Sequence, residues 1–327
     1  MNIGLLLSTS PEPPPAGSLT LIRVSRRAMA TTFEIAIPVG FPNAIAAAED
    51  ALDLIDELEQ QLSVYRESSE LTRVNNHAAE APVGVELQLF ELLQLCATLT
   101  NETARGFDPA TGSLIRAWGF LKREGRVPAG SELAAARAMS GFRHVILDSN
   151  LHTVRFRKTG LEINLGGIGK GYALDRAAER LRTRWGVTSA LLHGGGSSVL
   201  AIGRPPNDIR GWPIAIKHPT DPDRIIETVY LADRALGTSA ATHQFFEYNG
   251  KKYGHLLDPR TGCPAEGTLS ASCMAATAAT ADALSTAFFV RGAAWANEYC
   301  QSRPHLAAVI LPHDELNHEK HGRRTTS

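Results

Sequence analysis

The sequence lacks the features that mark several large classes of protein. Its four cysteines stand apart from one another, without a CxxC pair or a His/Cys cluster, which argues against structural zinc and against a disulfide framework. No stretch approaches the roughly 18 uninterrupted apolar residues of a membrane span. The 33 basic and 34 acidic residues leave a formal net charge of −1, and no segment carries a basic stripe. We therefore expect no membrane span and no nucleic-acid partner.

The N-terminus also lacks the parts of an export signal. Residues 1–18 include a few apolar side chains but no basic n-region, no h-region of sufficient length and no lipidation cysteine. We expect residues 1–22 to be a disordered lead and the protein to be soluble and cytoplasmic, unless a mis-assigned start codon has cut off an export signal. No linker-like stretch interrupts residues 25–312, so we predict one compact α+β domain over residues 23–312 and a polar tail over 313–327.

Periodicity in the apolar residues predicts a mixture of strands and helices. Phe33, Ile35 and Ile37 alternate as in a half-buried strand over 31–38, and an apolar stripe over 44–62 indicates an amphipathic helix. Gly-Thr-Ser at 237–239 predicts a turn. Further helices are predicted over 86–103, from about 172, and over 277–290, and further strands over 143–146, 153–157, 189–192, 212–217, 227–231, 269–275 and 307–311.

The pattern Asp-Pro-x-Thr-Gly occurs twice, in GFDPATGSL at 106–114 and in HLLDPRTGCP at 255–264. Proline fixes φ, the aspartate side chain can accept hydrogen bonds from backbone amides ahead of it, and glycine tolerates a positive φ. Each pentad therefore predicts a tight turn. His255, which directly precedes the apolar pair before the second turn, is a candidate base or phosphate contact, although a lone loop histidine more often has no such role.

Two glycine-rich stretches follow apolar strand-like segments. GGIGKG at 166–171 precedes a helix, an arrangement in which backbone amides, the helix N-terminus and Lys170 can bind a phosphate. Its spacing is neither that of a Walker A loop nor that of a GxGxxG dinucleotide site, and a glycine-rich turn with close helix packing is an equally good interpretation. For HGGGS at 193–197 a turn at a strand end is the better interpretation, with His193 as a structural histidine.

Two side-chain oxygens lie one helical turn apart in ADALSTAFF, residues 281–289. Asp282 and Thr286 are four residues apart, so their carboxylate and hydroxyl lie on one face of a helix that is otherwise apolar. A carboxylate, a hydroxyl and a backbone carbonyl are oxygen ligands of the kind that Mg²⁺ takes, with substrate phosphates and water completing the octahedron. The alternative, which is the better interpretation of this pair taken alone, is that Thr286 bonds a carbonyl of its own helix and Asp282 is exposed.

Taken together and in this order, eight motifs resemble the FAD:protein FMN transferase family, also called ApbE. They are MATTFEIAI, SVYRESSELTRVN, GFDPATGSLIRAWGF, INLGGIGKGYALD, HGGGSS, GTSAATHQFF, HLLDPRTGCP and ADALSTAFF, and they run from about Met29 to Val290. The resemblance implies a T-fold-related α+β architecture with mixed or antiparallel sheets flanked by helices. It also implies an Mg²⁺-dependent enzyme that splits FAD, attaches FMN through its phosphate to a Thr or Ser of an acceptor protein, and releases AMP.

The resemblance also assigns roles to single residues. The FAD contacts would be Met29, Tyr65, Gly106, Phe107, Asp108, Asn164, Lys170 and Leu256. The Mg²⁺ ligands would be the Gly167 carbonyl, Asp282, Ser285 and Thr286. His255 would assist deprotonation of the acceptor hydroxyl, and Lys170 would take charge from the pyrophosphate during the reaction.

Three positions depart from the usual family pattern and keep other functions open. Asn164 stands where an aspartate is usual, Ser197 replaces a common asparagine and Ala240 replaces a common glycine. One alternative is a hydrolase that uses water to split FAD into FMN and AMP. The other is a flavin-binding protein without turnover. We find no acceptor motif within this chain, so the acceptor should be another polypeptide.

Overall fold

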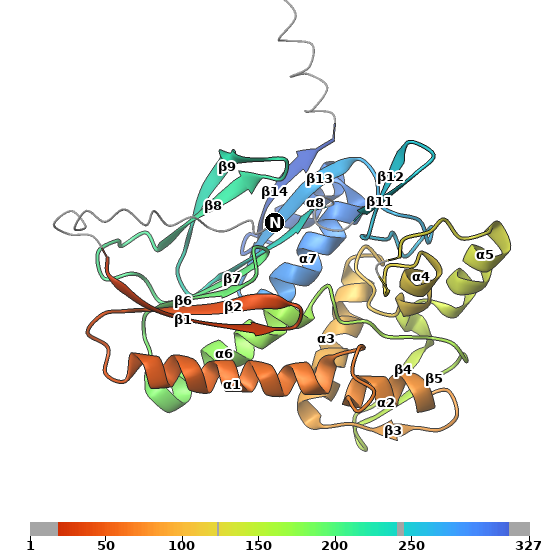
Figure 1. Ribbon diagram of the computed structural model, residues 1–327, viewed down its shortest axis with the longest axis horizontal. Helices are drawn as coiled ribbons and strands as arrows, with labels where there is room; N and C mark the ends of the chain where they lie inside the picture. Colours follow the sequence, from red (N-terminus) through yellow and green to blue (C-terminus); the bar gives the residue numbers. More distant parts are fainter. Residues whose placement is uncertain (1–18, 123, 241–244, 314–327) are drawn as a thin grey trace, which may run out of the picture. The chain divides into compact units, whose positions relative to one another are not determined.

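The computed structural model describes residues 19–122, 124–240 and 245–313 (Figure 1). Backbone contacts divide the chain into two compact units. Among the described residues, the first unit comprises 19–59, 168–238 and 274–282, and the second comprises the remainder. Helices alternate with antiparallel strand pairs in both units, which confirms the predicted α+β class.

The first unit is built around five consecutive strands of the largest sheet, in the order β1-β2-β6-β7-β10. A separate hairpin is formed by β8 and β9, and α6 packs on β6 and β7. Strands β6 and β7 are buried at every residue, as expected for continuous apolar runs inside a core. The elements of this unit are β1 (Leu21–Ala28), β2 (Thr31–Pro38), α1 (Ala44–Leu62), α6 (Gly169–Trp185), β6 (Ala190–Gly194), β7 (Ser198–Ile202), β8 (Trp212–His218), β9 (Asp221–Leu231) and β10 (Ala235–Ala240).

The turn between β1 and β2 has an unusual backbone. Ala28 pairs with Thr31, so Met29 and Ala30 form a two-residue loop, and their φ angles are 49° and 60°. Two positive φ angles in such a loop are typical of a type I′ turn, which is normally occupied by Asn and Gly. Neither Met nor Ala adopts this conformation without cost, so the hairpin holds Met29 in a strained position.

The second unit contains smaller sheets and most of the helices. Its three-stranded sheet has the order β3-β5-β4, and β11 and β12 form a hairpin. The elements are α2 (Glu70–His77), β3 (Val83–Gly84), α3 (Leu87–Glu102), α4 (Gly112–Ala117), α5 (Gly130–Met139), the short 3₁₀ helix η1 (Phe142–His144), β4 (Val145–Asp148), β5 (Thr153–Phe156), β11 (Phe245–Tyr248), β12 (Lys251–Gly254), β13 (Thr268–Ala275), α8 (Ala293–Gln301) and β14 (Ala307–Pro312).

Helix α7 (Ala278–Arg291) begins in the first unit and ends in the second. Its side chains are buried around most of the circumference, including Ala281, Leu284 and Phe288, each at most 1% exposed. A helix that is apolar on nearly all sides belongs to a protein core. The few polar residues that it carries therefore require partners or a function.

Most of the strongly periodic segments were predicted correctly. Strand β2 and helix α1 have the predicted bounds. The turn predicted at 237–239 is wrong, because these residues lie within β10. Strand β1 was not predicted, and it begins inside the stretch 1–22 that we expected to be disordered. The rest of that lead up to residue 18, and the predicted tail beyond His313, lie outside the described residues.

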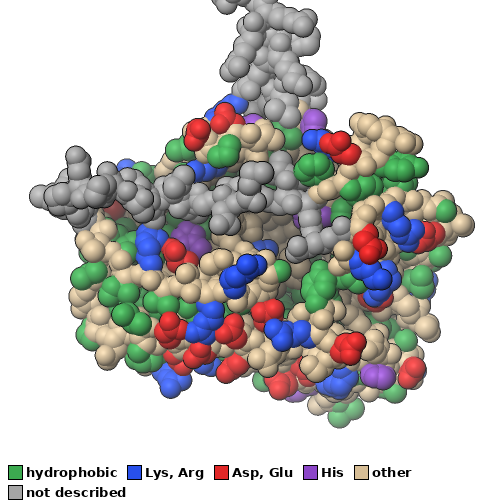
Figure 2. Space-filling view, viewed as in Figure 1, with side chains coloured by type: hydrophobic (Ala, Val, Ile, Leu, Met, Phe, Trp, Pro, Cys, Tyr) green, Lys and Arg blue, Asp and Glu red, His purple; other side chains and the backbone are tan. Residues whose placement is uncertain are grey.

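The surface agrees with the balanced composition. On the face drawn in Figure 2, basic and acidic side chains of the described residues are interspersed rather than separated into fields of one sign. None of the helices within the described ranges is both long and apolar enough to cross a membrane.

Candidate active site

The start of α6 packs unusually closely on the start of α7. A Cβ atom on Gly171 would lie 2.1 Å from the carbonyl oxygen of Ala278, so no larger residue fits there. The Gly171 amide donates a hydrogen bond of 2.8 Å to Oδ2 of Asp282. For Gly171 the interpretation of the glycine-rich stretch as a close helix contact is therefore correct, and this amide is bound by a protein carboxylate.

A second carboxylate bond runs in the opposite direction. Asp175 on α6 accepts hydrogen bonds from the amides of Ala278 at 2.7 Å and Ala279 at 2.8 Å, the first two residues of α7. Each helix thus supplies a carboxylate to the N-terminus of the other, where unpaired amides and the helix dipole favour negative charge. We call these bonds of Asp282 and Asp175 the reciprocal caps.

The Asp282 carboxylate is buried, with 7% of the residue exposed. The hydroxyl of Ser198 on β7 donates to it, at 2.8 and 3.0 Å from its two oxygens. Burial raises the pKa of Asp282 to about 6, while the positive charge of Lys170 and the bonds from Ser198 and Gly171 act in the opposite direction. The structure therefore excludes the alternative in which Asp282 is exposed, and it holds a carboxylate that gains from any nearby cation.

Hydroxyl groups cluster one turn further along α7. Ser239 Oγ lies 2.9 Å from Ser285 Oγ and 3.2 Å from Thr286 Oγ1. In the same unit, Thr286 Oγ1 lies 3.5 Å from the point that a Cβ atom on Gly167 would occupy. The Gly167 backbone thus lies beside Thr286, and the role of both as metal ligands stays a prediction.

These donors fit Mg²⁺ chemically. Asp282, Ser285 and Thr286 have i, i+3 and i+4 spacing on one helix, and with the Gly167 carbonyl they offer oxygen atoms only. The described residues contain no group of three or more His, Cys, Asp or Glu side chains that could hold a metal. A site with a single carboxylate suits an ion that shares its charge with substrate phosphates.

Both Asp-Pro-x-Thr-Gly turns form as predicted. Oδ1 of Asp108 accepts from the amide of Ala110 at 3.0 Å, and Oδ1 of Asp258 accepts from the amide of Arg260 at 2.8 Å. The bond to an amide two residues ahead is that of an Asx turn. Asp108 also accepts from the amide of Phe142 at 3.0 Å, so this predicted FAD contact already has structural bonds.

The residues before the first turn are tightly packed. Phe107 is 3% exposed, and a Cβ atom on Gly106 would lie 2.8 Å from Cγ of Arg291 and 3.3 Å from Cβ of Ala287 on α7. Gly106 is therefore required by close packing against α7. The Phe107 ring lies against Gly167, 3.4 Å from the position of its absent Cβ atom.

Asn164 lines a cavity of about 130 Å³ in the second unit. Its side-chain oxygen accepts from the amide of Gly166 at 2.8 Å. The neighbouring Ile163 is fixed by Asn75, whose side chain accepts from its amide at 2.8 Å and donates to its carbonyl at 2.9 Å. An aspartate at position 164 could accept the same hydrogen bond from the Gly166 amide and would add a negative charge. Asparagine in place of the usual aspartate therefore changes the electrostatics of this turn more than its shape.

The remaining predicted residues lie in less constrained places. Tyr65 is 70% exposed in a loop after α1, and Met29 is half-buried in the strained β-hairpin turn. His255 and Leu256 are half-buried directly after β12, and the Leu256 carbonyl accepts from the amide of Ala265 at 2.8 Å. The contacts of these residues with FAD stay predictions.

The HGGGS motif forms the hairpin between β6 and β7, as its structural interpretation predicted. Gly195 has a φ of 68°, and a Cβ atom there would lie 2.4 Å from Thr31 Oγ1, so both conformation and space require glycine. Burial lowers the pKa of His193 to about 4, and among the described residues its Nδ1 has no hydrogen-bond partner. We therefore assign His193 a structural role as a neutral histidine.

The family model of ApbE matches residues 29–310. The chain belongs to the ApbE family. It is 33% identical to the FAD:protein FMN transferase of Treponema pallidum over 261 residues, which cover 76% of this chain and 72% of that protein. It is 31% identical to the FAD:protein FMN transferase of Vibrio cholerae over 283 residues, which cover 83% and 81% of the two chains.

Solved ApbE structures have the same fold. The ApbE protein of Thermotoga maritima superposes with a TM-score of 0.82 at 31% identity, covering 90% of this chain and 94% of the other. The flavin transferase ApbE of Vibrio cholerae has a TM-score of 0.78 at 27% identity, with coverage of 90% and 94%. These likenesses support the architecture that the motif resemblance implied.

Three polar residues of this candidate site were not among the predicted site residues. Asp175 caps α7, Ser198 donates to Asp282, and Ser239 contacts Ser285 and Thr286. Ser198 and Ser239 lie in the HGGGSS and GTSAATHQFF motifs, so their neighbourhood carried a signal. Asp175 is the last residue of the INLGGIGKGYALD motif, but an aspartate on a helix usually faces solvent, so its role as a cap was not expected.

We predict that Asp175→Asn weakens the pH dependence of stability. Burial raises the pKa of Asp175 to about 7, and the charge of Asp282 adds to the rise, against the two amide bonds. A raised carboxyl pKa gives stability that is full below pH about 4 and is lost as the pH rises through about 7. In urea unfolding with EDTA, the wild type should lose stability relative to Asp175→Asn across this range, on the order of a few kcal/mol.

The matched control is Asp223→Asn, an exposed aspartate of β9. This variant should follow the wild-type pH curve. Parallel curves for Asp175→Asn and the wild type would show that Asp175 does not titrate in this window.

Proposed function

We propose that this chain is an Mg²⁺-dependent FAD:protein FMN transferase that modifies a Thr or Ser hydroxyl of another protein and releases AMP. Family membership over residues 29–310 and the names of the relatives support flavin transfer. The observation that carries the proposal is the buried carboxylate of Asp282, which stands on the same helix face as two hydroxyls in a chain of this family. A cytoplasmic location remains a prediction.

The proposed roles follow from the chemistry of each group. Asp282, Ser285, Thr286 and the Gly167 carbonyl would hold Mg²⁺, which when bound would neutralise pyrophosphate charge. Lys170 interacts electrostatically with Asp282 and would bind a phosphate oxygen of FAD. Met29, Tyr65, Gly106–Asp108, Asn164 and Leu256 would bind and orient the rest of FAD.

The reaction is a phosphoryl transfer with a simple balance of atoms. The acceptor hydroxyl oxygen forms a bond to the FMN-side phosphorus, and the bond from this phosphorus to the bridging oxygen breaks, so that AMP leaves. We assign His255 to take the proton of the hydroxyl. Most of the acceleration in such reactions comes from positioning and charge stabilisation.

A hydrolase is the second candidate, because water in place of the hydroxyl would give FMN and AMP from the same groups. A non-catalytic flavin-binding protein is the third. The combination of Asp282 with the hydroxyls of Ser285 and Thr286 on one helix face disfavours the binding protein, since a protein that only binds FAD has no need of a metal held against the pyrophosphate.

The deciding experiment incubates the purified protein with FAD, Mg²⁺ and an acceptor domain that carries the family's Thr/Ser target motif. Transfer predicts that the acceptor gains the mass of bound FMN while AMP appears in equal amount. AMP and FMN without a modified acceptor would identify a hydrolase. If FAD stays intact, a binding protein remains.

We predict that Asp282→Ala abolishes turnover, because it removes the one carboxylate of the proposed metal site. The same change also removes the cap of α6, so Asp282→Asn serves as a second variant whose amide oxygen still accepts from Gly171. We expect Asp282→Asn to remain folded and to lose at least roughly 100-fold in turnover. Its binding of Mn²⁺ as a substitute ion, measured directly by electron paramagnetic resonance, should weaken as well. Unchanged Mn²⁺ binding and Mg²⁺-dependent activity in both variants would remove this metal site.

We predict that His255→Ala still binds FAD but transfers FMN roughly 10²- to 10⁴-fold more slowly, as expected for loss of a general base. FAD binding is measured by flavin fluorescence and transfer by the mass of the acceptor. The matched control is His305→Ala, a histidine in the loop before β14. A normal rate in His255→Ala would place the base elsewhere.

A further inference from the structure

The second unit contains an arginine-lined cavity that no proposed role above uses. Its volume is about 330 Å³, and four arginines line it together with two alanines and a proline. The lining residues are Arg105, Ala134, Arg137, Ala138, Arg143, Pro259 and Arg260. No acidic side chain of the described residues belongs to this lining, so every charged side chain that lines the cavity is positive.

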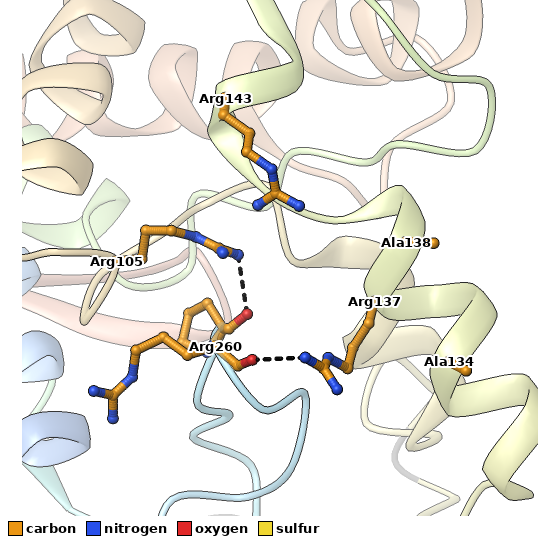
Figure 3. Close-up of a pocket in the computed structure, with 7 residues that line it drawn as sticks. Arg105, Ala134, Arg137, Ala138, Arg143 and Arg260 are labelled. Carbon is orange, nitrogen blue, oxygen red and sulfur yellow. Dashed lines mark hydrogen bonds between the residues drawn. The ribbon is translucent and has the colours of Figure 1, made fainter.

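Three of the guanidinium groups extend toward the same space from different segments. Figure 3 shows Arg105 from the loop after α3, Arg137 from α5 and Arg143 from η1 converging there, whereas the side chain of Arg260 extends away. Arg143 Nη1 lies 2.5 Å and Arg105 Nη2 lies 3.3 Å from the point that a Cβ atom on Gly141 would occupy. Two like charges therefore approach each other closely, which costs free energy unless an anion joins them.

The hydrogen bonds of these arginines leave most of their charge unpaired. Arg105 Nη2 donates to the carbonyl of Pro259 at 3.0 Å, and Arg137 Nη2 donates to the carbonyl of Arg260 at 3.1 Å. Carbonyl groups fix the direction of a guanidinium without neutralising it. Within the described ranges, the side chain of Arg143 forms no hydrogen bond or ion pair with another residue.

Carboxylates account for only two of the four charges. Arg260 is paired with Asp258 through two bonds of 2.9 and 2.7 Å, and Arg105 Nε lies 3.3 Å from Asp108. Arg137 and Arg143 have no carboxylate partner among the described residues. Two positive charges are therefore in excess, which matches a dianion.

The pKa of the neighbouring His144 is affected by the same positive charges. Burial lowers the pKa of His144, and the positive charges of Arg143, Lys158, Arg105 and Arg157 lower it further. Its Nε2 is buried without a hydrogen-bond partner among the described residues. The excess positive charge around the cavity therefore also acts on His144, which does not line the cavity.

We propose that this cavity binds a phosphate group through Arg105, Arg137 and Arg143. A phosphate monoester carries two charges and three terminal oxygens, so it can accept from two or three guanidinium forks at once, whereas a carboxylate has one charge and two oxygens. The volume exceeds that of a bare phosphate and lies at the low end of small-molecule sites, which start at about 300 Å³. The phosphate can therefore be free or carried by a small molecule such as AMP, the monoester that the proposed transferase reaction releases.

The test titrates the full-length protein, without FAD, with inorganic phosphate at constant ionic strength maintained with chloride, using calorimetry. Arg143→Gln and Arg137→Gln should each weaken phosphate binding roughly tenfold, since each removes charge-assisted bonds. Arg143→Lys should bind more weakly than the wild type but better than Arg143→Gln, because it keeps the charge and loses the fork. These side chains are exposed, so the variants should fold as the wild type does, which circular dichroism checks.

The matched control is Arg155→Gln, an exposed arginine of β5 that does not line the cavity. It should leave phosphate binding unchanged. An equal loss in Arg155→Gln and Arg143→Gln, or no binding beyond that of chloride, would overturn the proposal.

A second titration with AMP separates the two sources of the phosphate group. Tighter binding of AMP than of phosphate, lost in Arg143→Gln, would identify a nucleoside monophosphate as the ligand. Equal binding of both would identify the phosphate group alone. AMP binding that is insensitive to Arg137 and Arg143, with no binding of phosphate, would place the nucleotide elsewhere and refute this site. None of these results depends on turnover, so failure here and failure of the proposed function are distinguishable.

Discussion

The geometry of the candidate site depends on the reciprocal caps between α6 and α7. Each helix begins with amides that lack partners inside the helix, and each receives a carboxylate from the other. Because the bonds run in both directions, neither helix start can shift without breaking a buried charge-assisted bond. Gly171 makes this possible, since any side chain at that position would meet the Ala278 carbonyl. The position of Asp282 is therefore set by backbone packing as well as by its own hydrogen bonds.

The same arrangement carries an electrostatic cost. Asp175 and Asp282 are buried carboxylates whose pKa values rise to about 7 and about 6, and the charge of Asp282 contributes to the shift of Asp175. Near neutral pH the ionised forms are opposed by desolvation and by each other. Lys170 and the donors Ser198 and Gly171 offset part of this cost at Asp282. A divalent cation beside Asp282 would offset more, so its burial and the proposed metal role belong to one energetic balance.

Features that depend on residues close together in the sequence could be predicted, whereas contacts between distant segments could not. Strand β2 and helix α1 follow from periodicity, and the face shared by Asp282 and Thr286 follows from their spacing of four. By contrast, the partners of Ser198 and Ser239 lie 84 and 46 residues away, and those of Asp175 lie 103 and 104 residues away. No local pattern encodes such pairings. The amide of Gly171 shows most clearly what a local pattern cannot predict. The glycine-rich stretch was compatible with a phosphate site, but in the fold this amide donates its hydrogen bond to Asp282.

The two Asp-Pro-x-Thr-Gly turns show how one local motif acquires different surroundings. Asp108 and Asp258 each accept a hydrogen bond within their own turn, and they also pair with Arg105 and Arg260. These two arginines line the same cavity as Arg137 and Arg143, which have no carboxylate partner among the described residues. Some arginines elsewhere in the same molecule do have carboxylate partners: Arg26 forms ion pairs with Glu49, Asp53 and Asp56, and Arg116 has two bonds to Glu162. Backbone carbonyls orient Arg105 and Arg137, and because a carbonyl does not neutralise a guanidinium, the charge of Arg137 stays available for an anion from outside the chain.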